Sequence, residues 1–582
     1  MDNIDARHSP AEPGVAEPGT AQHEAGEAAA KRFGQIVAFL TALVTLLIVG
    51  ITYLQSDAGT LSQRAFRLAS RYSLEMMDRR VNGDAKVNYE FYGVYNAWDE
   101  YDSAYLSALE RGDDAAARRY LALRDRMAGL TPLLAPPYFD AETRSLDLAR
   151  YEVDQYILEV TTLQQRFAAA STEGSAWGSK AGAYIVHLTL LGLVLFVFGL
   201  SSTVSSRMAK RIFLILGLGL AAVVIVWAVV VYVRPVPVMP PAAIDAYARG
   251  DGLLYQGRDT EAVAAFTEAI SLHPNYADAY AGRGTAQADL EQYREAAADY
   301  EQARVTGGDS AGLLGDLGFT YYLEGRFDEA IAVNREALKL GPDELWIRFN
   351  QGLTLLVAGQ RDAAQREYAD ALALAAQQVA TARAAGQEPP SDLWWSLETS
   401  SDDLDLLMQA IDGYEVGGVS PVNTIVEPEA VRAAAHDLFA RMRSLAVALE
   451  YTGQPPAGEL TAQIGDLGFA MPVYDDEGEL TDYDVRDTFE FGVQSIAVLF
   501  DYEGMSDGQQ VLIKIYADGE EEPSWRADVP WELGASGSAQ YELGFAYSDL
   551  YVVDSGEYVV ELYVDSQLAQ RGSFVVLAEG EQ

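Results

Sequence analysis

The five histidines are the first residues to consider for catalysis or metal binding, because imidazole is a general base near neutral pH and a common metal ligand. They are His8, His23, His187, His273 and His436. No two of them have the spacing of a metal-ligand pair, and no glycine-rich phosphate loop follows a predicted strand. A Ser-His-Asp arrangement would have to rest on His273 or His436, and neither lies in a motif context. We therefore expect no histidine-based catalytic centre.

Carboxylates are abundant, with 86 Asp and Glu residues, whereas cysteine is absent. The absence of cysteine excludes thiolate nucleophiles, disulfides and Cys-ligated metal sites. Because acids are everywhere, no single pair is informative, and an envelope enzyme with a carboxylate site is only a lesser alternative. Calcium at acidic loop residues is a further alternative, but no EF-hand spacing occurs and a solvated acidic face is favoured; these loop residues include Asp475, Asp476, Glu477 and Glu479. We expect no enzyme activity, no metal and no cofactor.

The formal net charge of −45 restricts the partners. Nucleic-acid binding needs clustered Lys and Arg, so we exclude it. An acidic surface also opposes docking of the soluble parts on anionic lipid, whereas it attracts cations or basic partners. At 582 residues, of which 49% are hydrophobic, the chain has room for several domains with sizeable cores.

Three uncharged apolar runs of 22 residues predict transmembrane helices at Phe33–Leu54, Ala181–Ser202 and Ile212–Val233. At 1.5 Å per residue each run is about 33 Å long, which spans a hydrocarbon core of about 30 Å. Buried core helices are the alternative, but they are seldom so long and uncharged. A cleavable signal peptide would have a shorter apolar core than the first run, and no polar 32-residue tail would precede it. His187 lies within the second run, where we expect a neutral histidine bonded to a neighbouring helix.

The nine-residue loop between the second and third runs sets the orientation. It carries three bases and no acid, which places it in the cytoplasm by the positive-inside rule. The bases before the first run agree and those beyond it do not; the loop bases are Arg207, Lys210 and Arg211, the preceding ones Lys31 and Arg32, and the dissenting ones Arg64, Arg67 and Arg71. Interfacial tyrosines fit the same orientation at the outer ends, namely Tyr53, Tyr184 and Tyr232. We expect a plasma-membrane protein whose bulk is extracytoplasmic.

Residues 55–180 are predicted to form an antiparallel bundle of about four helices, with the first continuing span one and the last leading into span two. The predicted breaks are Asn82–Gly83, Gly112–Asp113 and Leu130–Asp140. Aromatic residues at steps of mostly three or four lie largely on one helix face; they are Tyr89, Phe91, Tyr92, Tyr95, Trp98, Tyr101 and Tyr105. Core packing is the favoured interpretation, and a ligand pocket, by architectural analogy with extracytoplasmic sensor domains, is the alternative.

A 34-residue period follows a Pro-rich linker at 234–242, with segments that begin at Ala243, Ala277, Ala311 and Leu345. Positions 8, 20 and 27 of each segment are small in all twelve cases, namely Gly250, Gly284, Gly318 and Gly352, then Ala262, Ala296, Ala330 and Ala364, then Ala269, Ala303, Ala337 and Ala371. Position 24 is Phe266, Tyr300, Asn334 and Tyr368. Small residues at these spacings let paired helices approach closely while the residue at position 24 fills the space between them.

This pattern resembles the tetratricopeptide-repeat (TPR) family. The resemblance implies helix pairs that stack into a superhelix, with a groove lined by positions 2, 5, 9 and 12 of each first helix. The groove candidates are Tyr247, Asp251, Leu254, Asp278, Thr285, Phe319, Tyr322 and Phe349. The Lys/Asn clamp for a peptide carboxylate is missing, so an apolar or basic peptide is expected, for example a helix laid in the groove. Alternatively, the helices that follow cover the apolar residues of repeat four. Asn334 in place of an aromatic residue predicts looser packing in repeat three.

A helical cap is predicted at 377–457, with helices Ser391–Gly413 and Glu427–Tyr451 and a role for Trp394 and Trp395 in covering the last repeat. From 458 the period changes to two, which predicts an antiparallel β-sandwich. Its clearest strands are Ile496–Tyr502, Val511–Ile515, Tyr558–Val564 and Phe574–Leu577. Asp554–Tyr558 resembles an immunoglobulin tyrosine corner, and Val560 stands where antibody domains carry a cysteine.

The predicted fold class is therefore multidomain: transmembrane helices, a helical bundle, an α-solenoid of TPR repeats and a C-terminal all-β sandwich. In order, the parts are a disordered cytoplasmic tail (1–32), span one (33–54), the bundle (55–180), span two (181–202), a cytoplasmic loop (203–211), span three (212–233), the linker (234–242), the repeats (243–376), the cap (377–457) and the sandwich (458–582). We expect a membrane-anchored scaffold for a protein or peptide partner. The alternative is a receptor that binds a ligand in the bundle, although the short cytoplasmic parts offer no output domain.

Overall fold

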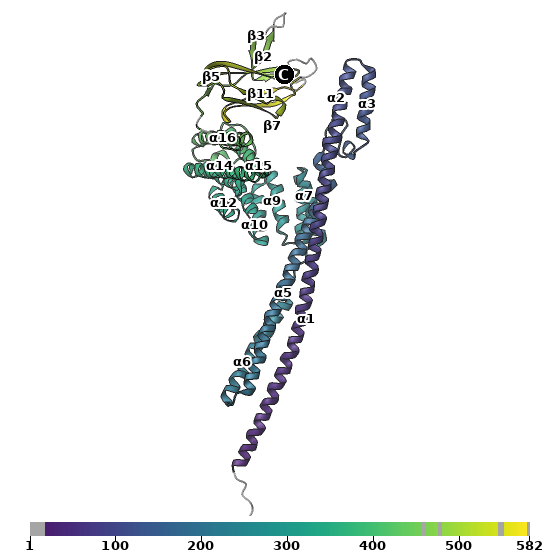
Figure 1. Ribbon diagram of the computed structural model, residues 1–582, viewed down its shortest axis with the longest axis vertical. Coiled ribbons are helices and arrows are strands. Elements are labelled where there is room, and N and C mark those ends of the chain that lie inside the picture. The colour runs from purple at the N-terminus through teal and green to yellow at the C-terminus, as the bar shows by residue number, and fades with distance from the viewer. Residues whose placement is uncertain are drawn as a thin grey trace, which may run out of the picture. The chain divides into compact units, whose positions relative to one another are not determined.

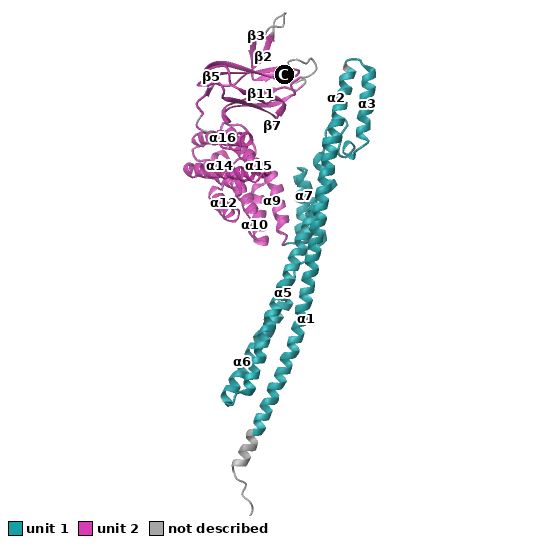
Figure 2. Cartoon of the chain, in the orientation of Figure 1, with its two compact units in different colours: residues 1–274 teal, residues 275–582 magenta. Residues whose placement is uncertain are grey.

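The computed structural model describes residues 18–141, 143–456, 458, 460–474, 480–544 and 552–578. The chain divides into two compact units, residues 1–274 and 275–582 (Figure 2). The boundary falls between the first predicted repeat and the second, so each unit is described by itself.

Unit 1 consists mainly of helices in its described part, with largely non-helical segments at 129–147 and 234–240. Its longest helices, α1 and α5, lie side by side along much of their length, and α6 packs against α5 (Figure 1). The helices are α1 (Pro18–Asn88), the π-helix η1 (Tyr89–Tyr95), α2 (Asn96–Glu110), α3 (Asp114–Ala128), the 3₁₀ turn η2 (Pro132–Leu134), α4 (Leu148–Glu152), the π-helix η3 (Val153–Ile157), α5 (Leu158–Thr203), α6 (Arg207–Val233), α7 (Pro241–Tyr255) and α8 (Asp259–Leu272).

The beginning of α1 corrects one prediction. Residues 18–32 were predicted to be disordered, but α1 begins at Pro18 and runs without interruption into the apolar run Phe33–Leu54. The segment is rich in Ala and Glu, which are strong helix formers, so it extends the helix that follows it. Residues 1–17, including His8, lie outside the described residues.

The predicted helix break at Asn82–Gly83 is also wrong, because α1 continues through both residues. Gly83 serves close packing: a Cβ at this position would lie 2.3 Å from the Cβ of Tyr156 on the facing helix segment. The other two predicted breaks are confirmed. Asp113 caps α3 by accepting from the amides of Ala115 and Ala116, and the segment 129–147 contains only the short turn η2.

Three helical stretches are long and apolar enough to cross a membrane, namely Glu27–Leu109, Leu148–Thr203 and Arg207–Val233. Buried residues of α1, α5 and α6 share one apolar core in these stretches. His187 is fully buried there, and its Nδ1 contacts the carbonyl oxygen of Ala183 on its own helix. The predicted bond to a neighbouring helix is therefore wrong; α6 instead contributes the Trp227 ring, 4.4 Å away between centroids.

The aromatic residues of the bundle divide between core and surface. Phe91, Tyr95 and Trp98 form a continuous ring stack that ends on Phe139, with centroid separations of 5.4, 6.1 and 5.0 Å. Trp98 is 7% exposed, whereas Tyr89 is 69% exposed. Core packing is thus confirmed for the stack and does not apply to Tyr89.

Unit 2 begins with helix pairs in series and ends in two β-sheets. Its helices are α9 (Ala277–Asp289), α10 (Tyr293–Gly307), α11 (Ala311–Leu323), α12 (Phe327–Leu340), α13 (Leu345–Val357), α14 (Arg361–Ala384), α15 (Ser391–Ile411), the turn η4 (Val422–Thr424) and α16 (Pro428–Tyr451). The small repeat positions make the close approaches that were predicted. A Cβ on Gly284 would lie 3.1 Å from the Tyr300 ring, and one on Gly352 would lie 2.7 Å from the Tyr368 ring.

The third repeat carries a polar defect in its core. Asn334 is fully buried, and neither its Oδ1 nor its Nδ2 has a hydrogen-bond partner among the described residues. It stands against Gly318, where a Cβ would lie 1.9 Å from Oδ1. The amide thus occupies a position that an aromatic ring fills in the other repeats, and its two polar atoms are desolvated without compensation.

We expect Asn334→Leu to raise the free energy of unfolding of the repeats by about 1–3 kcal/mol, because it keeps the branched shape and removes two unpaired polar atoms. Thermal or urea unfolding of the full chain in detergent would measure the change. Asn334→Asp is the matched comparison and should lower the stability, because it places a charge at the same site. A lower stability for the Leu variant would contradict the interpretation.

Two sheets share one apolar core at the end of the chain (Figure 1). The first has the order β1-β5-β2-β3, with β9 on the other edge of β5; the second has the order β4-β11-β10-β6-β7, with β8 also on β6. The strands are β1 (Gln463–Ile464), β2 (Gly468–Tyr474), β3 (Leu480–Val485), β4 (Thr488–Phe489), β5 (Ser495–Glu503), β6 (Gln510–Ala517), β7 (Glu520–Glu521), β8 (Ala527–Pro530), β9 (Ser536–Gly544), β10 (Gly556–Val564) and β11 (Gln567–Val576), with a short turn η5 (Pro523–Trp525) before β8. The predicted strands are present, while the acids at 475–479 lie outside the described residues.

Helix α16 joins the repeats to the second sheet through buried charges. Glu561 on β10 is 2% exposed, and its Oε2 accepts from Arg443 on α16 at 2.7 Å and from the Tyr563 hydroxyl at 2.5 Å. Arg443 also donates to the Tyr516 hydroxyl. The Leu568 amide donates to Ser444 Oγ at 2.9 Å. The cap and the sheet therefore pack as one body within unit 2.

Candidate functional site on the first helices of the repeats

The candidate site is the A-helix face, which we define as positions 2, 5, 9 and 12 of α9, α11 and α13 in unit 2 together with Asp316 and Asp403. The same positions of α7 belong to unit 1 and are described by themselves. On α7 they are partly covered. Asp251 accepts from Thr161 on α5 at 2.7 Å, and the adjacent Gly252 meets Val153, where a Cβ would lie 2.8 Å from Cγ1. Burial raises the pKa of Asp251. This carboxyl is bonded to α5 and only half-buried, so the groove role of Asp251 stays a prediction.

The other two candidates on α7 are partly buried. The Tyr247 ring lies 5.5 Å from the Phe266 ring of α8, between centroids, and Leu254 is half-buried beside Asp251 on the same helix. Two further contacts hold α7 on the bundle: the Tyr255 hydroxyl donates to Glu152 at 2.5 Å, and Arg166 pairs with Asp245 at 3.5 Å. Repeat one is therefore part of the bundle unit.

The candidates on the last two repeats are core residues. Tyr322 on α11 and Phe349 on α13 are each 1% exposed, and they belong to an apolar core that includes Leu397 and Leu404 of α15. The alternative that following helices cover repeat four is thus what the structure has, and the covering extends to Tyr322. The predicted groove roles of Tyr322 and Phe349 are wrong, because their side chains have no surface for a partner.

The part of the face that stays open lies on α9 and α11. Asp278 is exposed, Thr285 is half-buried with its hydroxyl 3.0 Å from that of Tyr300, and Phe319 is partly exposed and stacks on Tyr322 at 5.4 Å. Asp316, one turn before Phe319, is exposed. Sequence reasoning missed Asp316 because it occupies position 6, which is not among the groove positions of the family.

The cap adds a second carboxylate that sequence reasoning missed. Burial raises the pKa of the Tyr322 and Tyr368 phenols, and the nearby Asp403 carboxyl on α15 raises both further. Burial and the neighbouring Asp402 raise the pKa of Asp403 to about 7. Although the Asp316 side chain is exposed, the surrounding protein limits its hydration and raises its pKa to about 6. Within the described ranges, neither the Asp316 carboxylate nor the Asp403 carboxylate forms a hydrogen bond or an ion pair.

These observations define the chemistry of the open face. The Asp316 carboxylate lies one turn from the partly exposed Phe319 ring and has no cationic partner among the described residues, so it favours a ligand that brings positive charge. Asp403, half-buried on α15, adds a second acidic group beside Tyr322. A Lys or Arg side chain could pair with Asp316 and lie over Phe319, since cations are attracted to aromatic faces. The arrangement offers binding, with no nucleophile or general base positioned by a second group.

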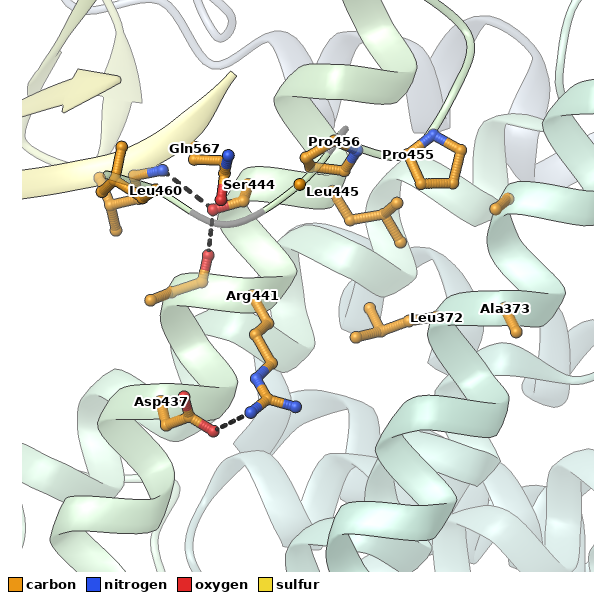
Figure 3. Close-up of a pocket in the computed structure, with 14 residues that line it drawn as sticks. Leu372, Ala373, Asp437, Arg441, Ser444, Leu445, Pro455, Pro456, Leu460 and Gln567 are labelled. Carbon is orange, nitrogen blue, oxygen red and sulfur yellow. Dashed lines mark hydrogen bonds and ion pairs between the residues drawn. The ribbon is translucent and has the colours of Figure 1, made fainter. Parts of the chain in front are cut away.

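Unit 2 also holds a cavity of about 530 Å³ between α14, α16 and the start of β11 (Figure 3). Figure 3 shows Leu372 and Ala373 on one wall and Leu445, Pro455 and Pro456 around another. Its charged groups, Asp437 and Arg441, pair with each other at 2.9 Å. The cavity is largely apolar and presents no unpaired charge from these two residues to a ligand.

The remaining histidines do not change this view. His273 ends α8 in unit 1, and His436 is exposed on α16 in unit 2. Among the residues that the structure describes, no group of three or more His, Asp or Glu side chains could hold a metal ion.

Comparisons with known proteins support the repeat assignment. The family model for the tetratricopeptide repeat matches residues 247–300 and 282–344. No curated protein matches the chain. Among solved structures, YrrB, a TPR protein with an unusual peptide-binding site, is 22% identical over 28% of this chain and 85% of its own, with a TM-score of 0.22. The DNA-bound alkylpurine DNA glycosylase AlkC of Pseudomonas fluorescens is 12% identical over 69% of this chain and 99% of its own, with a TM-score of 0.18.

Proposed function

We propose that this protein is a membrane-anchored TPR scaffold that binds a protein partner on the extracytoplasmic side through the open part of the A-helix face. TPR repeats imply protein–protein interaction, and the residues matched by the family model include the open face of α9 and α11. The observation that carries the proposal is the pair Asp316 and Phe319, which stay accessible on α11 while Tyr322 beside them is buried. The partner segment is basic and contains apolar residues.

Three observations support membrane anchoring and orientation. The three apolar helical stretches have the required length, and the helix ends around the loop at 204–206 are exposed. The bases Arg207, Lys210 and Arg211 follow this loop, which favours a cytoplasmic position. The large acidic unit 2 then lies on the opposite side of the membrane. We propose no enzymatic activity, and no cofactor is needed for this role.

The β region fits the same role as an interaction module of immunoglobulin-like type. The Tyr558 hydroxyl donates to the carbonyl of Asp554 at 2.9 Å, which is the bond expected of a tyrosine corner. Val560 is fully buried at the position where antibody domains carry a cysteine. These two features support the immunoglobulin-like assignment over other double-sheet folds.

The orientation has a simple test, because the natural chain contains no cysteine. We expect Glu415→Cys to react with a membrane-impermeant maleimide in intact cells, because residue 415 is exposed in unit 2. Ser205→Cys, exposed in the short loop, should react only after permeabilisation. The opposite labelling pattern would reverse the orientation, and equal labelling of both would argue against a membrane barrier between them.

The binding function can be tested with full-length protein in detergent and two probe peptides of equal length, one alternating Leu and Lys and the other Leu and Glu. We expect only the Leu-Lys peptide to bind, and Asp316→Lys to weaken its binding by about tenfold or more, because like charges then face each other. Asp328→Lys, an equal charge change at an exposed position of α12, is the control. Equal weakening by both variants would reduce the effect to general attraction by an acidic protein.

A further inference from the structure

A small basic hollow lies within unit 1, between the middle of α5 and the end of α6. Its volume is about 320 Å³. It is lined by small and apolar side chains and by two cations: Ala176, Ser179, Lys180 and Ala183 from α5, Val231 from α6, and Arg234, Pro235, Val236 and Pro237 from the linker. The chain has about twice as many acids as bases, so a hollow whose only charged lining residues are two cations suggests an anionic ligand.

The two cations lack acidic partners. Lys180 Nζ donates to the backbone carbonyl of Tyr232 at 3.2 Å and lies 5.2 Å from the centre of the Trp177 ring. Arg234 is exposed at the end of α6. No ion pair with a carboxylate is recorded for either cation in the described part of the chain. Their charge is therefore available to an anion that enters the hollow.

The position of the hollow identifies the source of that anion. Lys180 immediately precedes the second apolar run, and Arg234 immediately follows the third, so both lie at the extracytoplasmic edge of the proposed membrane region. Tyr232, 62% exposed, stands at the same level, as interfacial tyrosines do. Ala183 and Val231 continue the hollow on the side of the apolar helices. Phosphate groups of lipids occupy this level in a bilayer.

We propose that the hollow binds the headgroup phosphate of an anionic phospholipid, with Lys180 and Arg234 as the cations and the apolar walls along an acyl chain. The inference rests on the proposed membrane insertion. The Arg234 guanidinium can donate two hydrogen bonds to one phosphate, and the Lys180 ammonium adds a second positive charge. Basic pockets between membrane helices bind lipid headgroups through such cations. The occupant is a lipid, because the hollow has cations for a headgroup phosphate and, next to them, apolar side chains for an acyl chain.

Native mass spectrometry of the full-length protein in detergent, with phosphatidylglycerol or phosphatidylcholine added, tests the proposal. We expect a preference for phosphatidylglycerol that the Lys180→Gln, Arg234→Gln double variant reduces by about 10- to 30-fold, the effect of two bases near an anionic headgroup. Arg67→Gln with Arg71→Gln makes the same charge change at exposed positions of α1 and should leave the preference unchanged. An unchanged preference in the double variant overturns the proposal.

Two further arms remove ambiguity. Millimolar inorganic phosphate should not displace the lipid, and full displacement would identify a soluble-anion site instead. The single variant Arg234→Gln changes only an exposed residue and is expected to fold normally. A reduced preference of this variant for phosphatidylglycerol supports the site even if the double variant folds poorly. Carbonate extraction of membranes distinguishes membrane insertion from lipid binding. Release of the wild-type protein refutes membrane insertion, whereas retention without a lipid preference refutes only lipid binding in the hollow.

Discussion

Glu561→Ala is expected to lower the stability of unit 2 by about 3–5 kcal/mol, the cost of breaking a buried ion pair by removing one partner. Glu561 is 2% exposed, and it accepts from Arg443 at 2.7 and 3.2 Å and from Tyr563 at 2.5 Å. Its removal leaves the Arg443 guanidinium, whose side chain is 14% exposed, without a carboxylate at bonding distance. Arg571, 3.7 Å from the other oxygen, loses a neighbour as well.

The measurement is hydrogen exchange of α16 and β10 peptides in the full-length protein, which reports local stability without assuming a single unfolding step. Asp437→Ala is the control, because Asp437 pairs with Arg441 on the same helix, and both side chains are more than half exposed at 51% and 61%. Such a surface pair contributes less than about 0.5 kcal/mol. Equal effects of the two variants would contradict the claim that α16 is fixed to the sheet by buried charge.

Asp403→Asn is expected to raise the stability of unit 2 by about 1–3 kcal/mol at pH 8, and by less as the pH falls toward 4. Burial and Asp402 raise the pKa of Asp403 to about 7, compared with 3.8 for an ordinary Asp. The folded state therefore binds the proton more tightly, so the contribution of Asp403 to stability is present below about pH 4 and is lost as the pH rises through 7. The carboxyl is partly exposed, which keeps the expected gain below the full value of the shift.

Unfolding midpoints of wild type and variant between pH 4 and 8 would measure this effect. Asp405→Asn, two residues along α15, is the matched control, because Asp405 accepts from Arg571 at 2.7 and 2.9 Å. Its loss should destabilise the protein, the opposite sign from Asp403→Asn. A difference between wild type and Asp403→Asn that does not change with pH would show that the carboxyl is well hydrated.

The Asp403 prediction also bears on function. A carboxylate that destabilises the folded protein at neutral pH is typical of a binding site, where stability is given up for recognition. If a basic partner segment pairs with Asp403 and Asp316, its binding strengthens as the pH rises through 6 to 7, because both carboxyls then ionise. The stabilised Asp403→Asn variant should accordingly bind the Leu-Lys peptide more weakly than wild type.

Periodicity was enough to predict the repeats, the apolar helices and the main strands, because each pattern reflects a local geometric need. Small residues such as Gly284 and Gly352 must recur where paired helices touch. Gly83 is a position where prediction from neighbouring residues fails. In the sequence it resembles a helix break, but it allows close packing against Tyr156, which is 73 positions away. A distant partner leaves no signal in the spacing of neighbours.

The candidate site was predicted only in part for the same reason. Phe319 and Asp278 lie on the open face, as the family positions imply. Tyr322 and Phe349 occupy two other groove positions, 12 and 5, but α15 and α16 bury them, and no periodic rule states which repeat a cap will cover. Asp251 has its partner on α5, about ninety positions earlier in the chain. Position in a repeat thus identifies a helix face, whereas tertiary packing decides whether the face is open.

Site-specific photo-cross-linking in intact cells would show whether the open face of α11 binds a partner protein. A photoreactive phenylalanine in place of Phe319, on the open face of α11, should give a discrete cross-link to another protein. The same residue in place of Val305, which is 79% exposed at the end of α10, should give none. Asp316→Lys should abolish the Phe319 cross-link while the protein level is unchanged. Cross-links of equal yield from both positions, or none from Phe319, would contradict the account.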